Sequence, residues 1–307
     1  MIRYLALRIA LVIPVLVLVS VVSSLLIYLI PGDPVRAMFA RTGATPETIE
    51  NIRSQMGLDQ PWPAQYVRFV QGLLTGEIRS IRTRTPVVED FFRLLPSTMQ
   101  LAVASVGLAA GIGIPLGVLA AAKPRSPLDH AVTAVCAIAI SIPNFWLALL
   151  LMLLFAQQLA WFPATGGGSL RHLVLPATVL AVEQIALITG TVRAQMVGVL
   201  REDYVRTARA KGLSERTTVW AHAFHNALIP TITVLGLNLG YLLSSAVVVE
   251  AIFARPGIGR LIVDAILAKD FPAVQGTVLL VAVLYLAINT ITDACYAAID
   301  PRLRHET

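Results

Sequence analysis

The sequence predicts an all-α integral membrane protein with six transmembrane helices and an external segment after the first helix. Of its 307 residues, 56% are hydrophobic and only 14% are charged, whereas soluble domains carry about 25% charged residues. The apolar residues are gathered into uncharged runs that are long enough to cross a bilayer. This composition argues against a soluble single-domain enzyme.

Six stretches reach the length of about 20 apolar residues that a bilayer core requires. They are residues 9–30, 97–122, 131–157, 172–192, 226–249 and 271–292. The first is longer than the apolar core of a secretory signal, about 7–15 residues, and no small-residue cleavage site precedes Pro31. We therefore expect residues 1–30 to form a retained anchor helix.

The distribution of Lys and Arg predicts the orientation, because short cytoplasmic loops of membrane proteins are enriched in these residues. Twelve basic residues lie on the side of the N-terminus, against four in the short loops of the other side. An even number of spans places both termini on the same side of the membrane. We therefore expect both termini to be cytoplasmic.

The segments between the spans complete the predicted organisation. Residues 31–95 mix Pro, Gly and charged residues with short apolar patches and should form an external segment, with a helix from Pro63 to Leu74. Residues 96–299 form the membrane core, which includes a cytoplasmic loop at 194–225. Residues 300–307 form a cytoplasmic tail.

The cytoplasmic loop has the pattern of a helix, a turn and a second helix. Lys211 suits a last helical turn, Gly212 can adopt a left-handed stop position, Leu213 can supply an apolar contact, and Ser214 can cap the next helix. A basic helix-turn-helix is also typical of DNA recognition. This one is tethered to the bilayer at both ends, so no nucleic-acid partner is expected. Taken alone, the loop also fits a solvated segment that is basic only because short cytoplasmic loops are enriched in Lys and Arg.

Two parts of this loop carry a family resemblance. Residues Tyr204-Val205-Arg206-Thr207-Ala208-Arg209-Ala210-Lys211-Gly212-Leu213 and His222-Ala223-Phe224-His225-Asn226-Ala227-Leu228-Ile229-Pro230 closely resemble the cytoplasmic signature of permease subunits of bacterial ABC importers, in the dipeptide, oligopeptide and nickel branch. Further matches lie at Pro31-Gly32-Asp33-Pro34, Ser141-Ile142-Pro143-Asn144-Phe145-Trp146, Glu250-Ala251-Ile252-Phe253 and Asp300-Pro301-Arg302. The resemblance covers essentially the whole chain.

The resemblance implies a type I ABC importer permease in the inner membrane. Such a subunit pairs with a second homologous permease, two ATPase subunits and an extracytoplasmic binding protein. ATP and Mg²⁺ would bind to the partners and no cofactor to this chain, which lacks a Gly-x-x-x-x-Gly-Lys-Ser/Thr phosphate loop. The implied substrates are di- or oligopeptides, with nickel or another small solute as the alternative.

The resemblance also implies a docking helix for the ATPase. The residues concerned are Thr207, Ala208, Arg209, Ala210, Lys211, Gly212 and Leu213. The general importer signature begins with Glu-Ala-Ala, whereas this chain has Arg206, Thr207 and Ala208, so the acidic contact of that signature is not carried over. A second departure is Arg79, which stands where the family usually has a Gly. The alternative is that the ATPase recognises only the shape of the docking helix, and that no individual side chain contributes much to the contact.

Polar side chains at membrane depth are candidates for a substrate path. Glu183 is the only charged residue in the six stretches, and an ionisable residue at that depth is expensive enough to suggest a function. The candidate path residues are Asn144, Glu183, Gln184, Asn238 and Ser245. Each can instead form hydrogen bonds that pack helices together.

Two other classes of membrane protein remain as alternatives. A membrane-embedded enzyme is disfavoured because the chain contains neither His-Glu-x-x-His nor Gly-x-Ser-x-Gly. His222 and His225 lack a Cys or acidic partner at metal-ligand spacing, so no metal site is expected. A secondary transporter is the third choice.

Overall fold

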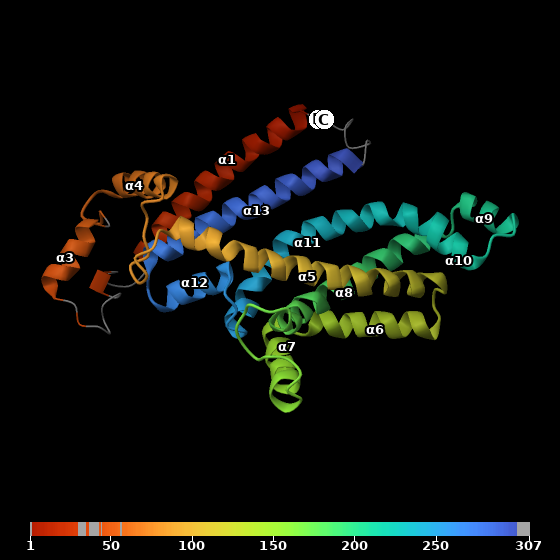
Figure 1. Ribbon diagram of the computed structural model, residues 1–307. Coiled ribbons are helices and arrows are strands. Elements are labelled where there is room, and N and C mark those ends of the chain that lie inside the picture. Colours follow the sequence, from red (N-terminus) through yellow and green to blue (C-terminus); the bar gives the residue numbers. More distant parts are fainter. Residues whose placement is uncertain (1, 30–34, 37–42, 44, 56, 300–307) are drawn as a thin grey trace. The chain divides into compact units, whose positions relative to one another are not determined.

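The computed structural model describes residues 2–29, 35–36, 43, 45–55 and 57–299. Within these ranges, side chains are described except at residues 2–10, 26, 29, 55, 222, 228–239 and 293–299. The motif at 31–34 and the tail at 300–307 lie outside the described residues. The described chain is helical, with a single isolated bridge between Arg79 and Pro86 instead of strands (Figure 1).

The chain divides into two compact units, each discontinuous in sequence. The first comprises Met1–Ser97 and Pro256–Thr290, and the second comprises Thr98–Arg255 and Ile291–Thr307. Helix α5 (Val87–Ala122) begins in the first unit and continues in the second. The predicted external segment is therefore grouped with the first and last membrane helices.

The first unit contains α1 and the helices that pack near its C-terminal end. Helix α1 (Ile2–Leu25) continues as a 3₁₀ turn, η1 (Leu26–Leu29), and retains Pro14 within it. The other helices of this unit are α3 (Pro46–Gln55), α4 (Trp62–Thr75), α12 (Ile258–Leu267) and most of α13 (Phe271–Ile299).

Helix α4 confirms the helix predicted from Pro63 to Leu74. It begins at Trp62 with Pro63 in its first turn, where a missing backbone N–H costs nothing, and it ends at Gly76 in the left-handed conformation, φ +73°. Its Tyr66 hydroxyl lies 2.8 Å from the Ser20 hydroxyl of α1. A hydrogen bond therefore joins α4 to the anchor helix.

The second unit contains the remaining membrane helices and the loop at 194–225 that was predicted to be cytoplasmic. Its elements are α6 (Pro127–Ser141), α7 (Asn144–Leu151), the π-helical η2 (Met152–Gln158), α8 (Arg171–Val199), α9 (Asp203–Ala210), α10 (Glu215–Thr217), the π-helical η3 (Thr218–Ala223) and α11 (Phe224–Ile252). Helix α8 packs along both α6 and α11. Buried side chains from α5, α7, α8 and α11, such as Leu101, Leu180 and Phe253, form its main hydrophobic core.

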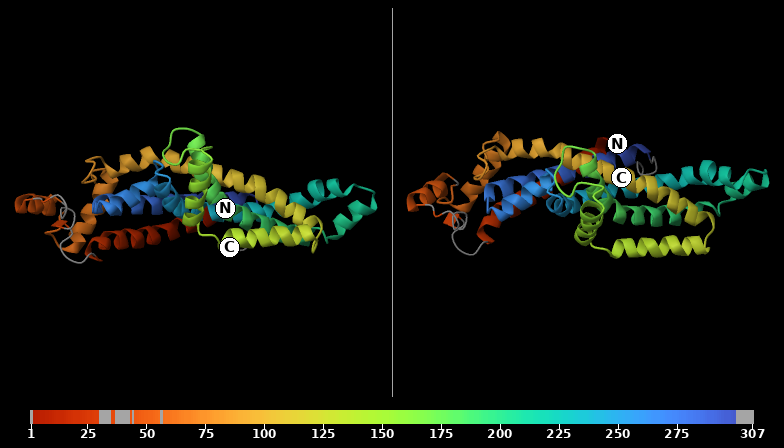
Figure 2. Two further views of the ribbon diagram at one scale, coloured as in Figure 1. Left: turned by 90° about the horizontal axis from the view of Figure 1, so that it is seen from below. Right: turned by 60° about the horizontal axis from the view of Figure 1, so that its bottom comes forward.

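The structure corrects the third predicted stretch, 131–157, which is not one helix. Helices α6 and α7 meet at a bend of 98° (Figure 2). Pro143 precedes α7, and Ile142 has the extended conformation that a following proline favours, with φ −86° and ψ 118°. The sequence pattern did not reveal this break because the apolar run continues through it.

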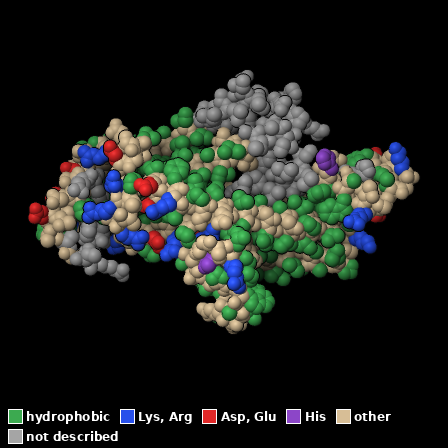
Figure 3. Space-filling view, in the orientation of Figure 1, with side chains coloured by type: hydrophobic (Ala, Val, Ile, Leu, Met, Phe, Trp, Pro, Cys, Tyr) green, Lys and Arg blue, Asp and Glu red, His purple; other side chains and the backbone are tan. Residues whose placement is uncertain are grey.

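Three helices in the described part of the chain are long and apolar enough to cross a bilayer, and the bent α6–α7 pair makes four if it counts as one span. Shorter apolar segments lie at Leu11–Leu25 and Gly240–Ile252, within α1 and α11. Apolar side chains cover the surface over α6 (Figure 3). Two of the exposed apolar residues of this helix are Val135 and Ile138, at 64% and 61% exposure. Such a surface suits lipid or another membrane helix.

Two glycines allow α5 and α8 to approach each other closely. A Cβ at Gly117 would lie 2.7 Å from Val192 Cβ, and one at Gly113 would lie 3.0 Å from the Ile185 carbonyl oxygen. The Thr189 hydroxyl donates to the Gly113 carbonyl over 3.2 Å. Small residues four apart are a common means of close helix contact in membranes. Here the contact positions α8, whose C-terminal end leads into the loop at 194–225.

Candidate functional site

Helix α9 presents one buried face and one exposed face at the end of the second unit (Figure 1). Val205 and Ala208 are buried, and Val205 belongs to a hydrophobic cluster that includes Val219 and Ala223 of η3. Thr207, Arg209 and Ala210 are exposed. The buried face therefore fixes α9 to the start of α11, while the other face remains available to a partner.

The turn after α9 has the geometry that the sequence predicted. Gly212 is left-handed with φ +84°, its N–H donates to the Arg209 carbonyl over 2.9 Å, and the Leu213 N–H donates to the Ala208 carbonyl over 3.3 Å. These two bonds define a Schellman motif. The Leu213 side chain remains 40% exposed, and Lys211 is also exposed.

Side chains on both sides of the turn hold the two helices together. The Ser214 hydroxyl accepts from the Thr217 N–H over 3.2 Å and caps α10. Arg209 donates to both carboxylate oxygens of Glu215, over 2.7 Å and 3.3 Å. Because this pair is exposed, it adds at most about 1 kcal/mol, so its effect is mainly on the geometry of the turn.

A buried ion pair that the sequence did not predict joins α6 and α8 in the same unit. Asp129 of α6 is 3% exposed in its side chain, and both of its oxygens accept from Arg193 of α8, one of them over 2.7 Å. The Arg125 N–H also donates to Asp129, over 2.9 Å. The spacing from Ser126 to Asp129 could have identified a helix start, but nothing in the sequence pattern selects Arg193 as the partner.

The structure brings two of the five candidate path residues together. Asn144, the first residue of α7, donates to the Glu183 carboxylate of α8 over 3.2 Å. The carboxylate thus lies near the N-terminal end of α7, where the helix dipole favours negative charge. The pairing fits a path residue as well as the alternative of a paired Glu that packs helices.

In the described part of the chain, Gln184 and Ser245 are not joined to this pair by a hydrogen bond. Gln184 is 2% exposed, and its side-chain nitrogen has no hydrogen-bond partner among the described residues. Ser245 is half-buried on α11. The side chain of Asn238, also on α11, lies outside the described residues.

Comparison with known protein families shows which family this chain belongs to. The family described as binding-protein-dependent transport system inner membrane component matches residues 113–305, and the N-terminal region of such components matches residues 1–102. The chain belongs to this family. It is therefore a multi-pass permease component of the inner membrane, and ATP hydrolysis takes place in partner subunits.

Relatives of this permease match over its whole length. A Brucella abortus (strain 2308) protein, named as a permease of a peptide transport system, is 42% identical over 97% of this chain and 98% of its own length. The di/tripeptide transport system permease protein of Pseudomonas aeruginosa (strain UCBPP-PA14) is 39% identical, with 100% of both chains covered. A solved structure of the MetNI methionine ABC transporter matches in fold, with a TM-score of 0.59, 18% identity, and 68% of this chain and 95% of that chain covered.

Proposed function

We propose that this permease is one of two homologous subunits that form a path for di- or oligopeptide uptake. Two ATPase subunits would drive transport, and an extracytoplasmic binding protein would deliver the peptide. The observation that carries the substrate class is the full-length similarity to relatives whose names assign them to peptide transport. ATP and Mg²⁺ are expected in the partner subunits, and no cofactor in this chain.

The proposed contact with the ATPase is the segment from Thr207 to Leu213. Its exposed face offers the Lys211 cation and two small side chains, Thr207 and Ala210. Arg209 is also exposed but is paired with Glu215. Spans α8 and α11 hold the segment at both ends, and its buried face is packed on η3. A short helix held in this way moves with the spans when its docking cleft opens or closes.

The proposed orientation places both termini and this docking segment in the cytoplasm, and residues 31–95 outside. The excess of basic residues on the N-terminal side supports this orientation. The same orientation places Asp129 and Arg193 at the cytoplasmic end of the helices. There, the buried pair would pass movement of the docking segment from α8 to α6.

The proposed substrate path includes Asn144, Glu183, Gln184, Asn238 and Ser245. The contact between Asn144 and Glu183 at the break between α6 and α7 supports it, because discontinuous membrane helices are typical of transporter substrate sites. In this arrangement Glu183 would receive the peptide amine.

The test is uptake by the reconstituted transporter. The chain is assembled with its companion permease, its ATPases and its binding protein in proteoliposomes, and uptake of a labelled dipeptide is measured beside uptake of Ni²⁺. We expect dipeptide accumulation that requires ATP and stops when the nucleotide site of the ATPase is inactivated. Accumulation of Ni²⁺ without dipeptide would refute the substrate class but keep the permease role.

A further inference from the structure

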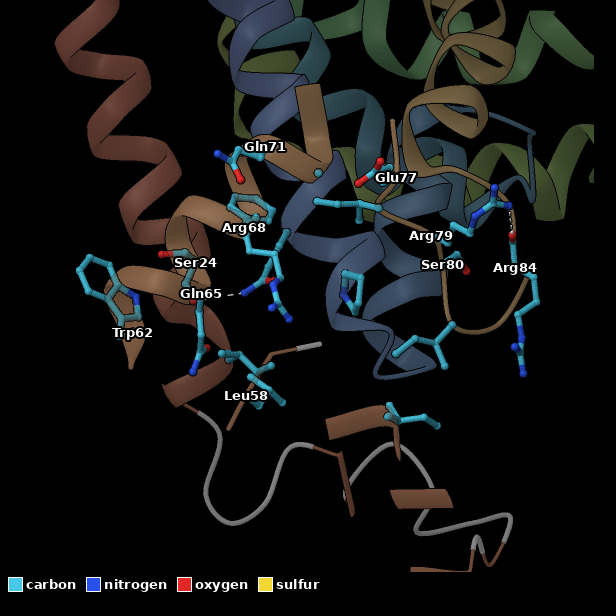
Figure 4. Close-up of a pocket in the computed structure, with 18 of the residues that line it drawn as sticks. Ser24, Leu58, Trp62, Gln65, Arg68, Gln71, Glu77, Arg79, Ser80 and Arg84 are labelled. Atoms are coloured by element: carbon cyan, nitrogen blue, oxygen red, sulfur yellow. Dashed lines mark hydrogen bonds between the residues drawn. The ribbon is translucent and has the colours of Figure 1, made fainter. Parts of the chain in front are cut away.

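A cavity of about 640 Å³ lies in the first unit, between α4, the segment that follows it, and the helices α1 and α13. This volume lies within the range of small-molecule sites, about 300–1,000 Å³. Figure 4 shows Gln65, Arg68 and Gln71 of α4 on one side of the cavity and Glu77, Arg79 and Ser80 on the other. None of the candidate path residues, which belong to the second unit, lines this cavity.

The floor and walls of the cavity combine apolar side chains with polar groups, several of which already have partners. Apolar lining residues are Ile27, Ile52, Leu58, Phe69, Ile78 and Ile81. The Gln275 side chain donates to the Ser24 carbonyl over 3.2 Å, and the Gln65 side chain donates to the Gln60 carbonyl over 2.7 Å. The Ser80 hydroxyl donates to the buried Asp270 carboxylate over 2.6 Å. These bonds fix the walls without using the charged lining residues.

Four charged side chains line the cavity: Arg68, Arg79, Arg84 and Glu77. Three guanidinium groups against one carboxylate leave a net charge of +2 on the lining. In the described part of the chain, none of the four takes part in an ion pair, and the guanidinium groups of Arg68 and Arg84 make no hydrogen bond. Their charges are therefore available to a ligand.

Two of the three guanidinium groups are positioned by the backbone. Arg68 lies directly against Gly57, since a Cβ at Gly57 would come within 2.6 Å of Arg68 Nη1. Gly57 is itself left-handed, φ +68°, so the turn leaves room for the guanidinium where another residue would not. Arg79 donates through Nη1 to the Arg84 carbonyl over 3.1 Å, which leaves its other nitrogen donors free.

We infer that this cavity binds an acidic short peptide, at a site formed by other residues than the proposed path residues. At neutral pH a dipeptide with one acidic side chain carries two carboxylates and one ammonium group. The arginines match the carboxylates, for which guanidinium is the geometrically suited partner, and Glu77 matches the ammonium group. The apolar floor accommodates the remainder of the peptide. The choice of a peptide as ligand rests on the proposed function, whereas the preference for negative charge rests on the cavity.

The test is direct binding, measured by calorimetry on the assembled transporter in nanodiscs without its binding protein. The probes are alanyl-glutamate, alanyl-lysine and inorganic phosphate. We expect alanyl-glutamate to bind at least tenfold more tightly than either of the other two. Arg68→Gln should weaken its binding about tenfold or more, because one charge-assisted contact is lost. Arg82→Gln, on the segment that carries Arg79 and Arg84 but outside the cavity lining, is the matched control and should bind like the parent.

Three results would overturn the inference: unchanged binding by Arg68→Gln, an equal loss in Arg82→Gln, or phosphate binding as tight as that of alanyl-glutamate. If Arg68→Gln does not assemble, Arg68→Lys keeps the charge without the bidentate geometry and should still weaken binding. Because binding is measured apart from uptake, dipeptide uptake without cavity binding removes only this inference. Cavity binding without dipeptide uptake removes the proposed function instead.

Discussion

The left-handed turn at Gly212 allows a graded test of the docking segment. An L-amino acid in this conformation costs about 1–2 kcal/mol, more if it is β-branched and less if it is Asn. A Cβ at Gly212 would meet no atom within 4 Å, so a substitution strains the backbone without crowding a neighbour. Gly212→Asn, Gly212→Ala and Gly212→Val should therefore be impaired in that order, from least to most.

The expected magnitude follows from the cost of the turn. A penalty of about 1–2 kcal/mol changes an equilibrium by a factor of roughly 5–30, so Gly212→Ala should bind the ATPase less tightly by about this factor. Gly212→Val should lose more, and Gly212→Asn should stay close to the parent. The assays are co-purification of the ATPase and coupled ATP hydrolysis, with membrane levels of each variant as the control.

The order of the variants distinguishes the backbone from the side chain. Asn is larger than Ala, so a docking surface that merely lacks room would tolerate Ala better than Asn. That order, or full coupling by Gly212→Val, would refute the role of the left-handed turn. Loss of all three variants from the membrane would point to a requirement for folding and would also contradict the reasoning.

Three further predictions concern packing, the path and the orientation. Gly117→Ala should destabilise the protein by about 1–3 kcal/mol through overpacking of α5 against α8. Gly111→Ala, whose new Cβ meets open space, should not. Equal stability of the two variants in thermal unfolding would contradict the close packing at Gly117. Glu183→Gln should retain membrane levels but lower peptide uptake by an amount equivalent to about 1–3 kcal/mol, and normal uptake would leave Glu183 a packing residue. An introduced cysteine at Thr45 should react with an impermeant reagent in intact cells, and one at Thr217 should not; the reverse pattern would invert the proposed orientation.

The sequence predicted those elements whose ends are set by local signals. Gly76 ends α4, and Gly212 and Ser214 define the turn after α9, because left-handed glycines and capping hydroxyls act within a few residues. The predicted stretch 97–122 covers the apolar part of α5. The helix itself begins ten residues earlier, at Val87, with turns that carry Glu89 and Arg93.

Features that depend on distant residues could not be predicted in this way. Pro143 interrupts the helix, whereas Pro14 and Pro176 lie inside helices, so a proline alone does not mark a break. The pairing of Asp129 with Arg193 and the cavity around Arg68 join residues that are far apart in sequence. Such contacts follow from helix packing, which periodicity does not specify.

The break between α6 and α7 also has a consequence for biogenesis. Helix α6 has 15 residues, and α7 with η2 has 8 and 7, so each half falls short of the about 20 residues that partition stably as a single span. Both α6 and α7 pack against α8, which is synthesised later. We therefore expect this region to integrate fully only after α8 has left the ribosome. In a product truncated before Arg171, α6 and α7 should remain at the membrane surface, although α1 and α5 precede them.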